Sequence, residues 1–320
     1  MSTTPNTTEN QSKVNFEHNL ENHNINNKTQ NILCILLAIV LFIVLTSLYA
    51  GQIQLLNFVG TKFLNTPKEN LIVIETTFKD LGVDILVGAG IYLKTAVDFA
   101  ILTGILMAKY PGFKNRIAIE NGTALGNALG TAVVLTIWFF FKDIQWLLAL
   151  MVLVASLVLF ELAKSGLEHI EEAEHEGQKV PNFVKVSAQK ISFVLDKVMV
   201  IVSPVLSKIM PSMKFDSTKQ LSFKGLLLAS FTIPFILGLD DFAGYVTLFN
   251  VVNVFGFGVG VFLGHTILNV ALFINPHFTT RAVKNPVVSL IGTLAFIGLG
   301  LYGLFEVGKI TLEMLHIIKH

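Results

Sequence analysis

The stretch FILGLDDFAGYVTLF, residues 235–249, places two adjacent aspartates, Asp240 and Asp241, inside an otherwise apolar run. The apolar segment extends over 225–250, and a helix needs about 20 such residues to cross a bilayer. An aspartate at the centre of a membrane helix costs about 2.5–3.5 kcal/mol on insertion scales. These carboxylates therefore need a bound cation, a proton or a basic partner.

The composition of the whole chain supports a membrane protein. Of its 320 residues, 52% are hydrophobic and 14% are charged, whereas soluble domains carry about 25% charged residues. We therefore predict an all-α polytopic membrane protein. The seven predicted spans are 32–51, 83–108, 117–141, 144–163, 225–250, 254–276 and 287–308.

These spans divide the chain into five regions. Residues 1–31 are polar, which predicts a disordered tail, and 32–82 contain a span and an external connection with an amphipathic piece over 55–64. Residues 83–163 hold three spans, 164–224 form a loop, and 225–320 hold three more spans and a short tail. The two groups of three spans are the core of the predicted architecture.

The distribution of Lys and Arg predicts the orientation in the cell inner membrane. The tail and the loops at 109–116, 164–224 and 277–286 hold 16 of the 23 basic residues, and the opposite side holds 6. The positive-inside rule places the N-terminus and the large loop in the cytoplasm and the C-terminus outside. A net charge of +1 gives no reason to expect a nucleic-acid partner. The single cysteine, Cys34, cannot form an intrachain disulfide.

The large loop contains two different segments. ELAKSGLEHIEEAEHEGQKVP (161–181) is acidic and is expected to extend the preceding span as a helix. Its Glu and His side chains at helical spacing fit either a weak divalent-ion site or a solvated charged helix. Residues 182–210 alternate lysines with apolar residues at helical spacing, which fits a helix lying on the anionic inner leaflet or one packed under the bundle.

The two groups of three spans look like copies of each other. Asp98 begins the tripeptide Asp-Phe-Ala, and Asp241 begins the same tripeptide. The next span of each copy carries glycines four residues apart, which let helix backbones approach closely. These glycines are Gly122, Gly126 and Gly130 in the first copy and Gly256, Gly260 and Gly264 in the second. Because each copy has three spans, the second enters from the opposite side, which is the inverted-repeat plan of secondary transporters.

The aspartates are the main candidate ligands. Asp98 and Asp241 occupy equivalent positions and are expected to face one another, with Asp240 as a second ligand or facing a water-filled path. Lys94 stands one helical turn before Asp98 and offers a structural ion pair instead, but the second copy has Leu237 at that position. Pro234 favours a bent or broken helix near Gly238, whose freed carbonyls suit a hard cation.

Three further polar residues complete the predicted metal site. Asn127 and His265 occupy equivalent positions in the two copies. Asn127 also fits a hydrogen bond between helices, and His265 a proton carrier. Glu120 lies near the predicted cytoplasmic start of its span, where it fits a vestibule or a contact with lipid headgroups. The predicted metal ligands are Asp98, Asp241, Asp240, Asn127, His265 and Glu120.

Two motifs resemble a known family. GLDDFAGYVTLF (238–249) resembles the second-half signature of the cadmium-resistance transporters, and TAVDFAILTGILM (95–107) resembles their first-half helix with its aspartate. Both are similar to the lysine-exporter superfamily, which includes manganese exporters. The resemblance implies a three-plus-three repeat and a cation site at the aspartates. The extra N-terminal span and the long loop depart from the six-span plan and leave the substrate open.

These observations predict a secondary transporter that exports a divalent cation such as Mn, Ca, Zn or Cd, because no thiolate is near the site to select a softer ion. An exporter of amino acids or small organic cations, and a non-transporting membrane stress or scaffold protein, remain alternatives. The chain carries no enzyme motif, and neither catalytic residues nor a resident cofactor are expected. The expected partners are membrane lipids and the cation, and homo-oligomer formation stays open.

Overall fold

The computed structural model describes residues 28–74, 78–110, 112–175, 177–209, 221–249 and 252–315. Within these ranges, the side chains of residues 78–80, 98, 108, 201–209, 233, 236–245 and 277 are not described. Every regular element of the described residues is a helix. The described helices are α2 (Lys28–Val59), η1 (Gly60–Leu64), η2 (Lys68–Asn70), α3 (Phe78–Thr95), α4 (Val97–Lys109), α5 (Phe113–Phe141), α6 (Gln145–His175), α7 (Asn182–Ile209), α8 (Phe223–Leu248), α9 (Val254–Ile274), α10 (Pro276–Val283) and α11 (Pro286–Met314).

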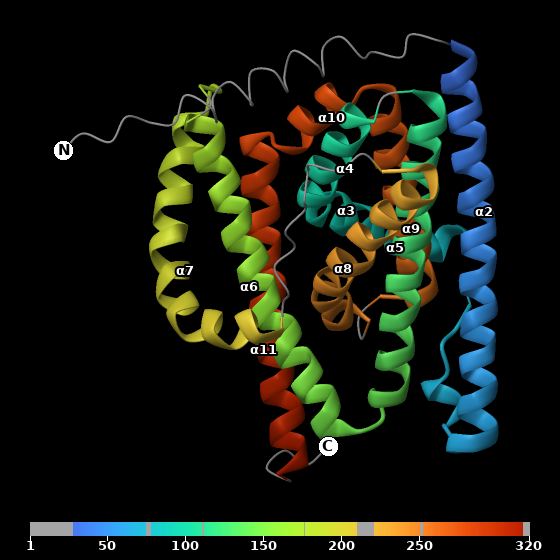
Figure 1. Cartoon of the computed structure of the whole chain (residues 1–320). Coiled ribbons are helices and arrows are strands. Elements are labelled where there is room, and N and C mark those ends of the chain that lie inside the picture. The colour runs from blue at the N-terminus through green and yellow to red at the C-terminus, as the bar shows by residue number, and fades with distance from the viewer. Residues whose placement is uncertain are drawn as a thin grey trace.

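The helices form a bundle with two distinct ends. In Figure 1, α2 begins at one end and α11 finishes at the other, with α5 and α6 running in opposite directions between them. Five of the described helices are long and apolar enough to cross a membrane, and the bent pair α3–α4 makes a sixth if it counts as one span. The prediction of an all-α multi-pass membrane protein is therefore confirmed.

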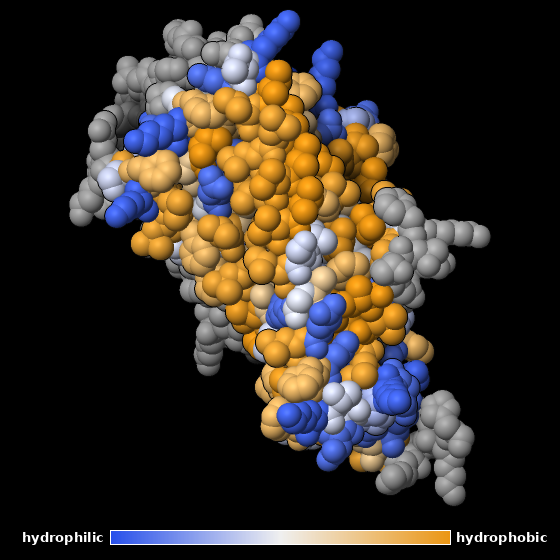
Figure 2. Space-filling view, turned by 90° about the vertical axis from the view of Figure 1, so that its right-hand side faces the viewer, coloured by the Kyte–Doolittle hydropathy of each residue, from blue (hydrophilic) through white to orange (hydrophobic). Residues whose placement is uncertain are grey.

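The surface of the bundle matches a lipid environment. Figure 2 shows the face that carries α2 as a broad hydrophobic surface, with hydrophilic residues gathered mainly toward its two ends. On α2, Leu36 is 54% exposed, Val40 is 56% exposed and Leu48 is 65% exposed. Contiguous exposed apolar surface of this extent is typical of a protein that contacts lipid.

Helix α2 is longer than the sequence predicts. The predicted span ended at residue 51, with a separate amphipathic piece over 55–64, but α2 continues to Val59 and then directly into η1. The polar residue Gln52 does not end the helix because its side-chain amide donates to the carbonyl of Ala132 (2.7 Å) and to Thr136 Oγ1 (2.9 Å). The helix ends at Asn65, whose φ of 52° is left-handed.

The predicted span 83–108 is two helices. Residues 81–95 and 99–107 are bent by 65° relative to each other, around Ala96 with its ψ of 19°. The Thr95 hydroxyl donates to the carbonyl of Tyr92 (3.1 Å), and such contacts bend helices. By contrast, α8 continues through Pro234, so the helix is not broken there.

The large loop is mostly helical. As predicted, the acidic segment extends the preceding span, since α6 continues to His175. Residues 182–209 form α7, which lies antiparallel beside α6 (Figure 1). Lys185 Nζ lies 2.5 Å from Glu174 Oε1, and Lys164 Nζ lies 3.4 Å from Asp196 Oδ1. The later loop at 277–286 also contains a helix, α10, which the sequence analysis missed.

Close packing pairs the two groups of helices. Helix α5 packs against α8, α3 packs against α9, and α6 packs against α11. A Cβ atom at Gly122 of α5 would lie 2.5 Å from the carbonyl oxygen of Leu227 in α8. A Cβ atom at Gly260 of α9 would collide with the carbonyl oxygen of Ile85 in α3. Both crossings therefore depend on glycine at the contact.

The glycine four residues further along each helix repeats this pattern one turn later. A Cβ atom at Gly126 would collide with the carbonyl oxygen of Phe231, and one at Gly264 would lie 3.0 Å from the carbonyl oxygen of Ala89. Phe231 follows Leu227 by four residues, as Ala89 follows Ile85. The two crossings therefore use the same register of glycine against backbone.

Candidate functional site

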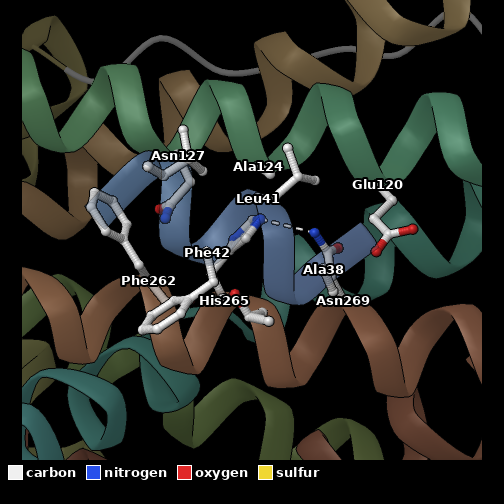
Figure 3. A pocket seen from close by; sticks show the side chains of 11 residues that line it. Ala38, Leu41, Phe42, Glu120, Ala124, Asn127, Phe262, His265 and Asn269 are labelled. Carbon is white, nitrogen blue, oxygen red and sulfur yellow. Dashed lines mark hydrogen bonds between the residues drawn. The ribbon is translucent and has the colours of Figure 1, made fainter. Parts of the chain in front are cut away.

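A small cavity lies between α2, α5 and α9 (Figure 3). Its volume of about 10 Å³ has room for about one water molecule. Helix α2 supplies an apolar wall, and α5 and α9 supply the polar groups. The lining residues are Ala38, Leu41, Phe42 and Leu45 from α2, Glu120, Ala124 and Asn127 from α5, and Phe262, His265, Thr266 and Asn269 from α9.

A buried chain of hydrogen bonds connects three helices beside this cavity. Asn269 Nδ2 lies 2.9 Å from both Thr123 Oγ1 and His265 Nε2, and the Tyr92 hydroxyl lies 2.5 Å from His265 Nδ1. Because the Asn269 amide donates to Nε2, the hydrogen of the neutral imidazole is on Nδ1 and points to the Tyr92 oxygen. The chain ties α3 to α5 through α9 and holds His265 in one tautomer.

Glu120 is buried between α2 and α5 rather than exposed to headgroups. Its side chain is 1% exposed, and the Cys34 thiol donates to Oε1 over 3.5 Å. Its second oxygen, Oε2, has no hydrogen-bond partner among the described residues. A buried acceptor without a partner costs about 1–3 kcal/mol, so this oxygen is suited to a ligand or a proton.

Asn127 also lines the cavity, and its amide nitrogen has no partner among the described residues. It is 4% exposed, and within the described parts of the chain its Nδ2 group makes no hydrogen bond. In Figure 3 Asn127 and Glu120 lie at opposite ends of the lining. The expected alternative, a hydrogen bond from Asn127 to another helix, is therefore not seen for this amide nitrogen.

Arg116 is a buried residue that the sequence analysis placed in a loop. It belongs to α5, is 1% exposed, and its Nη1 donates to the carbonyl of Phe273 over 2.6 Å. Phe273 lies in the last turn of α9, where the helix dipole favours a cation. One sequence feature could have indicated that Arg116 belongs to the helix: it stands four residues, about one turn, before Glu120.

The structure brings three of the six predicted ligands together and leaves three undescribed. Glu120, Asn127 and His265 line one cavity. The side chains of Asp98, Asp240 and Asp241 lie outside the described residues, although their backbones belong to α4 and α8. Phe99, next to Asp98, packs on His265 with ring centroids 5.3 Å apart.

Metal binding by the described part of this constellation would require rearrangement. Both ring nitrogens of His265 already take part in hydrogen bonds, so ligation would break one of them. No cluster of three or more His, Cys, Asp or Glu side chains suited to a metal occurs among the described side chains. The described side chains include the acidic segment of α6 as far as His175. Within that segment, His169 Nδ1 lies 3.5 Å from Glu172 Oε2.

Lys94, the predicted alternative partner of Asp98, packs across Gly292 of α11, where a Cβ atom would collide with its side chain. No ion pair to Lys94 is found among the side chains that the structure describes. Its predicted pairing with Asp98 falls on an undescribed side chain and stays a prediction. Lys94 therefore contributes packing between α3 and α11.

Tyr92 and Thr123 belong to the buried chain of hydrogen bonds and were not predicted from the sequence. Asn269 stands four residues after His265 on α9, so helical spacing could have suggested that these two side chains are neighbours. Thr123 directly follows Gly122, a glycine of the predicted close contact. Nothing in the sequence connects Tyr92 with His265. A scan against protein-family models and searches of curated proteins and solved structures find no match to this chain.

Proposed function

We propose that this protein is a secondary transporter of a small cation, built from two inverted three-helix repeats and the additional helix α2. One repeat comprises α3–α4, α5 and α6, and the other comprises α8, α9 and α11. The main support is the reciprocal packing of the two repeats. The first helix of each repeat contacts the second helix of the other (α3 with α9, and α8 with α5), and the third helices, α6 and α11, contact each other. A two-fold axis between the repeats would generate this pattern.

The directions of the helices support the inversion. In Figure 1, α5 and α9 run in opposite directions, and so do α6 and α11. The bundle starts and finishes at opposite ends, which fits an odd number of crossings. Together with the basic residues, this arrangement supports a cytoplasmic N-terminus and an external C-terminus.

The polar interior supports transport over a purely structural role. Glu120 and Asn127 come from the first repeat, and His265 and Asn269 come from the second, and all four face one cavity. Polar groups inside a membrane protein are costly and mark ion or substrate paths. Two of these side chains keep an atom without a described partner, which a scaffold would have no reason to retain.

The proposed substrate is a divalent metal cation, exported through Asp98 and Asp241 with Asp240 nearby. Equivalent aspartates on the first helices of the two repeats support a charge-compensated ion between them. The cavity lined by Glu120, Asn127 and His265, the three other proposed ligands, has room for a single water-sized species, which fits an ion better than an amino acid. Five of the six proposed ligands offer oxygen or imidazole donors without a described thiol beside them, which suits a hard or borderline ion. The expectation that no thiol lies near the site is wrong for Glu120, whose Oε1 accepts from the Cys34 thiol.

The test is transport by the purified protein in liposomes that contain a metal-sensitive dye. Mn²⁺, Ca²⁺, Zn²⁺ and Cd²⁺ are offered with and without a pH gradient. Asp98→Asn and Asp241→Asn are expected to abolish flux. The matched control is Asp143→Asn, which should leave flux unchanged because Asp143 is an exposed residue just after the end of α5. Folded Asp98→Asn and Asp241→Asn variants that still carry ions at the wild-type rate would disprove the assignment. Flux of an amine such as lysine, without metal flux, would support the alternative substrate class.

A further inference from the structure

Helix α7 has a buried face and an exposed apolar face. Its buried apolar residues are Val184, Ala188, Leu195 and Met199, and α7 packs against α6 and α11. The exposed apolar residues are Phe183, Val186, Phe193, Val194 and Val200. Phe193 is 65% exposed and Val200 is 77% exposed, which is unfavourable if water covers this face. The outer face therefore needs an apolar cover.

Two lysines lie in the middle of this outer face. Lys190 and Lys197 are both exposed, and a spacing of seven residues places them on the same side of the helix, about 10 Å apart. Lys197 Nζ lies 4.3 Å from the centre of the Phe193 ring. The one acidic residue of α7, Asp196, is paired with Lys164 of α6. The outer face is therefore both apolar and positively charged.

Neighbouring helices show the depth at which this face lies. Asp196 is level with Lys164 of α6, and the hydroxyl of Thr293 in α11 donates to the adjacent carbonyl of Ala163 (3.3 Å). Thr293 lies seven residues, about 10 Å, inside the start of α11. On that part of α11, Ile291 is 63% exposed. The middle of α7 lies beside α6 in Figure 1 and is therefore level with an apolar, outward-facing part of α11.

We propose that Lys190 and Lys197 bind the phosphate of an anionic phospholipid in the leaflet at the end where α2 begins. Phe193 and Val194 then lie in the acyl boundary of that leaflet. Lysines extend their charged ends from such a boundary to lipid headgroups. The same end carries the excess of basic residues, and the cytoplasmic leaflet is the one that holds anionic lipids. This site does not depend on the transport activity.

The first test compares lipid binding by two double Lys→Gln variants of equal charge and by a double Lys→Arg variant that keeps both charges. Phosphatidylglycerol is titrated into the detergent-purified full chain, and bound lipid is counted by native mass spectrometry. Lys190→Gln/Lys197→Gln is expected to weaken binding roughly 30-fold, or about fivefold per lysine. The control Lys179→Gln/Lys224→Gln removes two exposed lysines elsewhere and is expected to bind normally, as is Lys190→Arg/Lys197→Arg. Equal binding by all variants, or equal weakening by the control, would overturn the proposal.

The second test asks whether lipid covers the face. A nitroxide at Val194→Cys, in a Cys34→Ala background, is expected to be relaxed by oxygen dissolved in phosphatidylglycerol-containing bilayers and protected from a water-soluble nickel complex. A label that is open to the nickel complex would contradict the proposal. A wild-type dimer that becomes monomeric in Lys190→Gln/Lys197→Gln, with unchanged lipid binding, would assign the face to a second copy and would also overturn it.

Discussion

The α5–α8 and α3–α9 crossings share one backbone arrangement but differ in their polar chemistry. Gly126 meets the carbonyl of Phe231 in one crossing, and Gly264 meets the carbonyl of Ala89 in the other. Beside the first, Asn127 has an amide nitrogen without a described partner, whereas beside the second, His265 is held at both ring nitrogens. The packing is therefore duplicated, while His265 is held at both ring nitrogens and the amide nitrogen of its equivalent, Asn127, has no partner among the described residues.

The largest expected effect concerns the shared packing. Gly126→Leu and Gly264→Leu should both strongly destabilise the bundle. A Cβ atom at Gly126 would collide with the carbonyl oxygen of Phe231, and one at Gly264 would lie 3.0 Å from the carbonyl oxygen of Ala89, with the rest of the leucine side chain still to be placed. Overpacking typically costs 1–3 kcal/mol and occasionally more, and here the rigid neighbour puts the expected loss at about 3 kcal/mol or above. Size-exclusion chromatography and thermal unfolding in detergent measure it.

Gly51→Leu is the matched control for this pair. Gly51 lies in α2, and no described atom of a neighbouring helix lies within 4 Å of a Cβ atom added there, so its replacement should leave the unfolding temperature nearly unchanged. If Gly126→Leu behaves like Gly51→Leu while Gly264→Leu does not, the two crossings are not equivalent and the proposed repeat loses its main support.

The next effect separates His265 from Asn127. His265→Leu should lower the free energy of unfolding by about 2–3 kcal/mol, because it removes the two buried hydrogen bonds that the imidazole makes with the Tyr92 hydroxyl and the Asn269 amide. Asn127→Leu should be neutral or stabilising, because it removes a buried donor that has no described partner. Equal losses in the two variants would show that Asn127 is held as firmly as His265.

A smaller change examines one end of the buried chain. Tyr92→Phe keeps the ring that packs on Phe99 but removes the oxygen that accepts from His265. The expected loss is about 1–2 kcal/mol, less than for His265→Leu. Chemical or thermal unfolding of the purified protein checks the order. If Tyr92→Phe lowers the free energy of unfolding as much as His265→Leu does, most of the stabilisation from these buried hydrogen bonds comes from the bond between Tyr92 and His265.

The smallest expected change is at the contact between α2 and α5. Cys34→Ala removes a weak thiol donor to Glu120 and should change the free energy of unfolding by about 1 kcal/mol or less. Because Cys34 is 0% exposed, its thiol should react with a maleimide only after unfolding. Rapid labelling of the native protein would mean that α2 separates readily from α5.

The apolar runs of the sequence were sufficient to predict most helices, because a bilayer requires about 20 consecutive apolar residues for each span. The extension of α6 to His175 was also predictable from its helical spacing. The glycines four residues apart indicated close helix contacts, although they did not identify the opposite helices. These features depend on neighbouring residues in the chain, so they are predictable without knowledge of how the helices pack.

The remaining features arise only from the packing of the helices, because they depend on partners far away in the sequence. Gln52 continues α2 because it bonds to α5, and Arg116 is buried because it meets the end of α9. The predicted equivalents Asn127 and His265 differ because, among the described side chains, His265 meets a tyrosine from α3 whereas the amide nitrogen of Asn127 meets no hydrogen-bond partner. Helical periodicity can place a side chain on a face of its own helix, but the hydrogen bonds that it makes depend on which helix packs against that face.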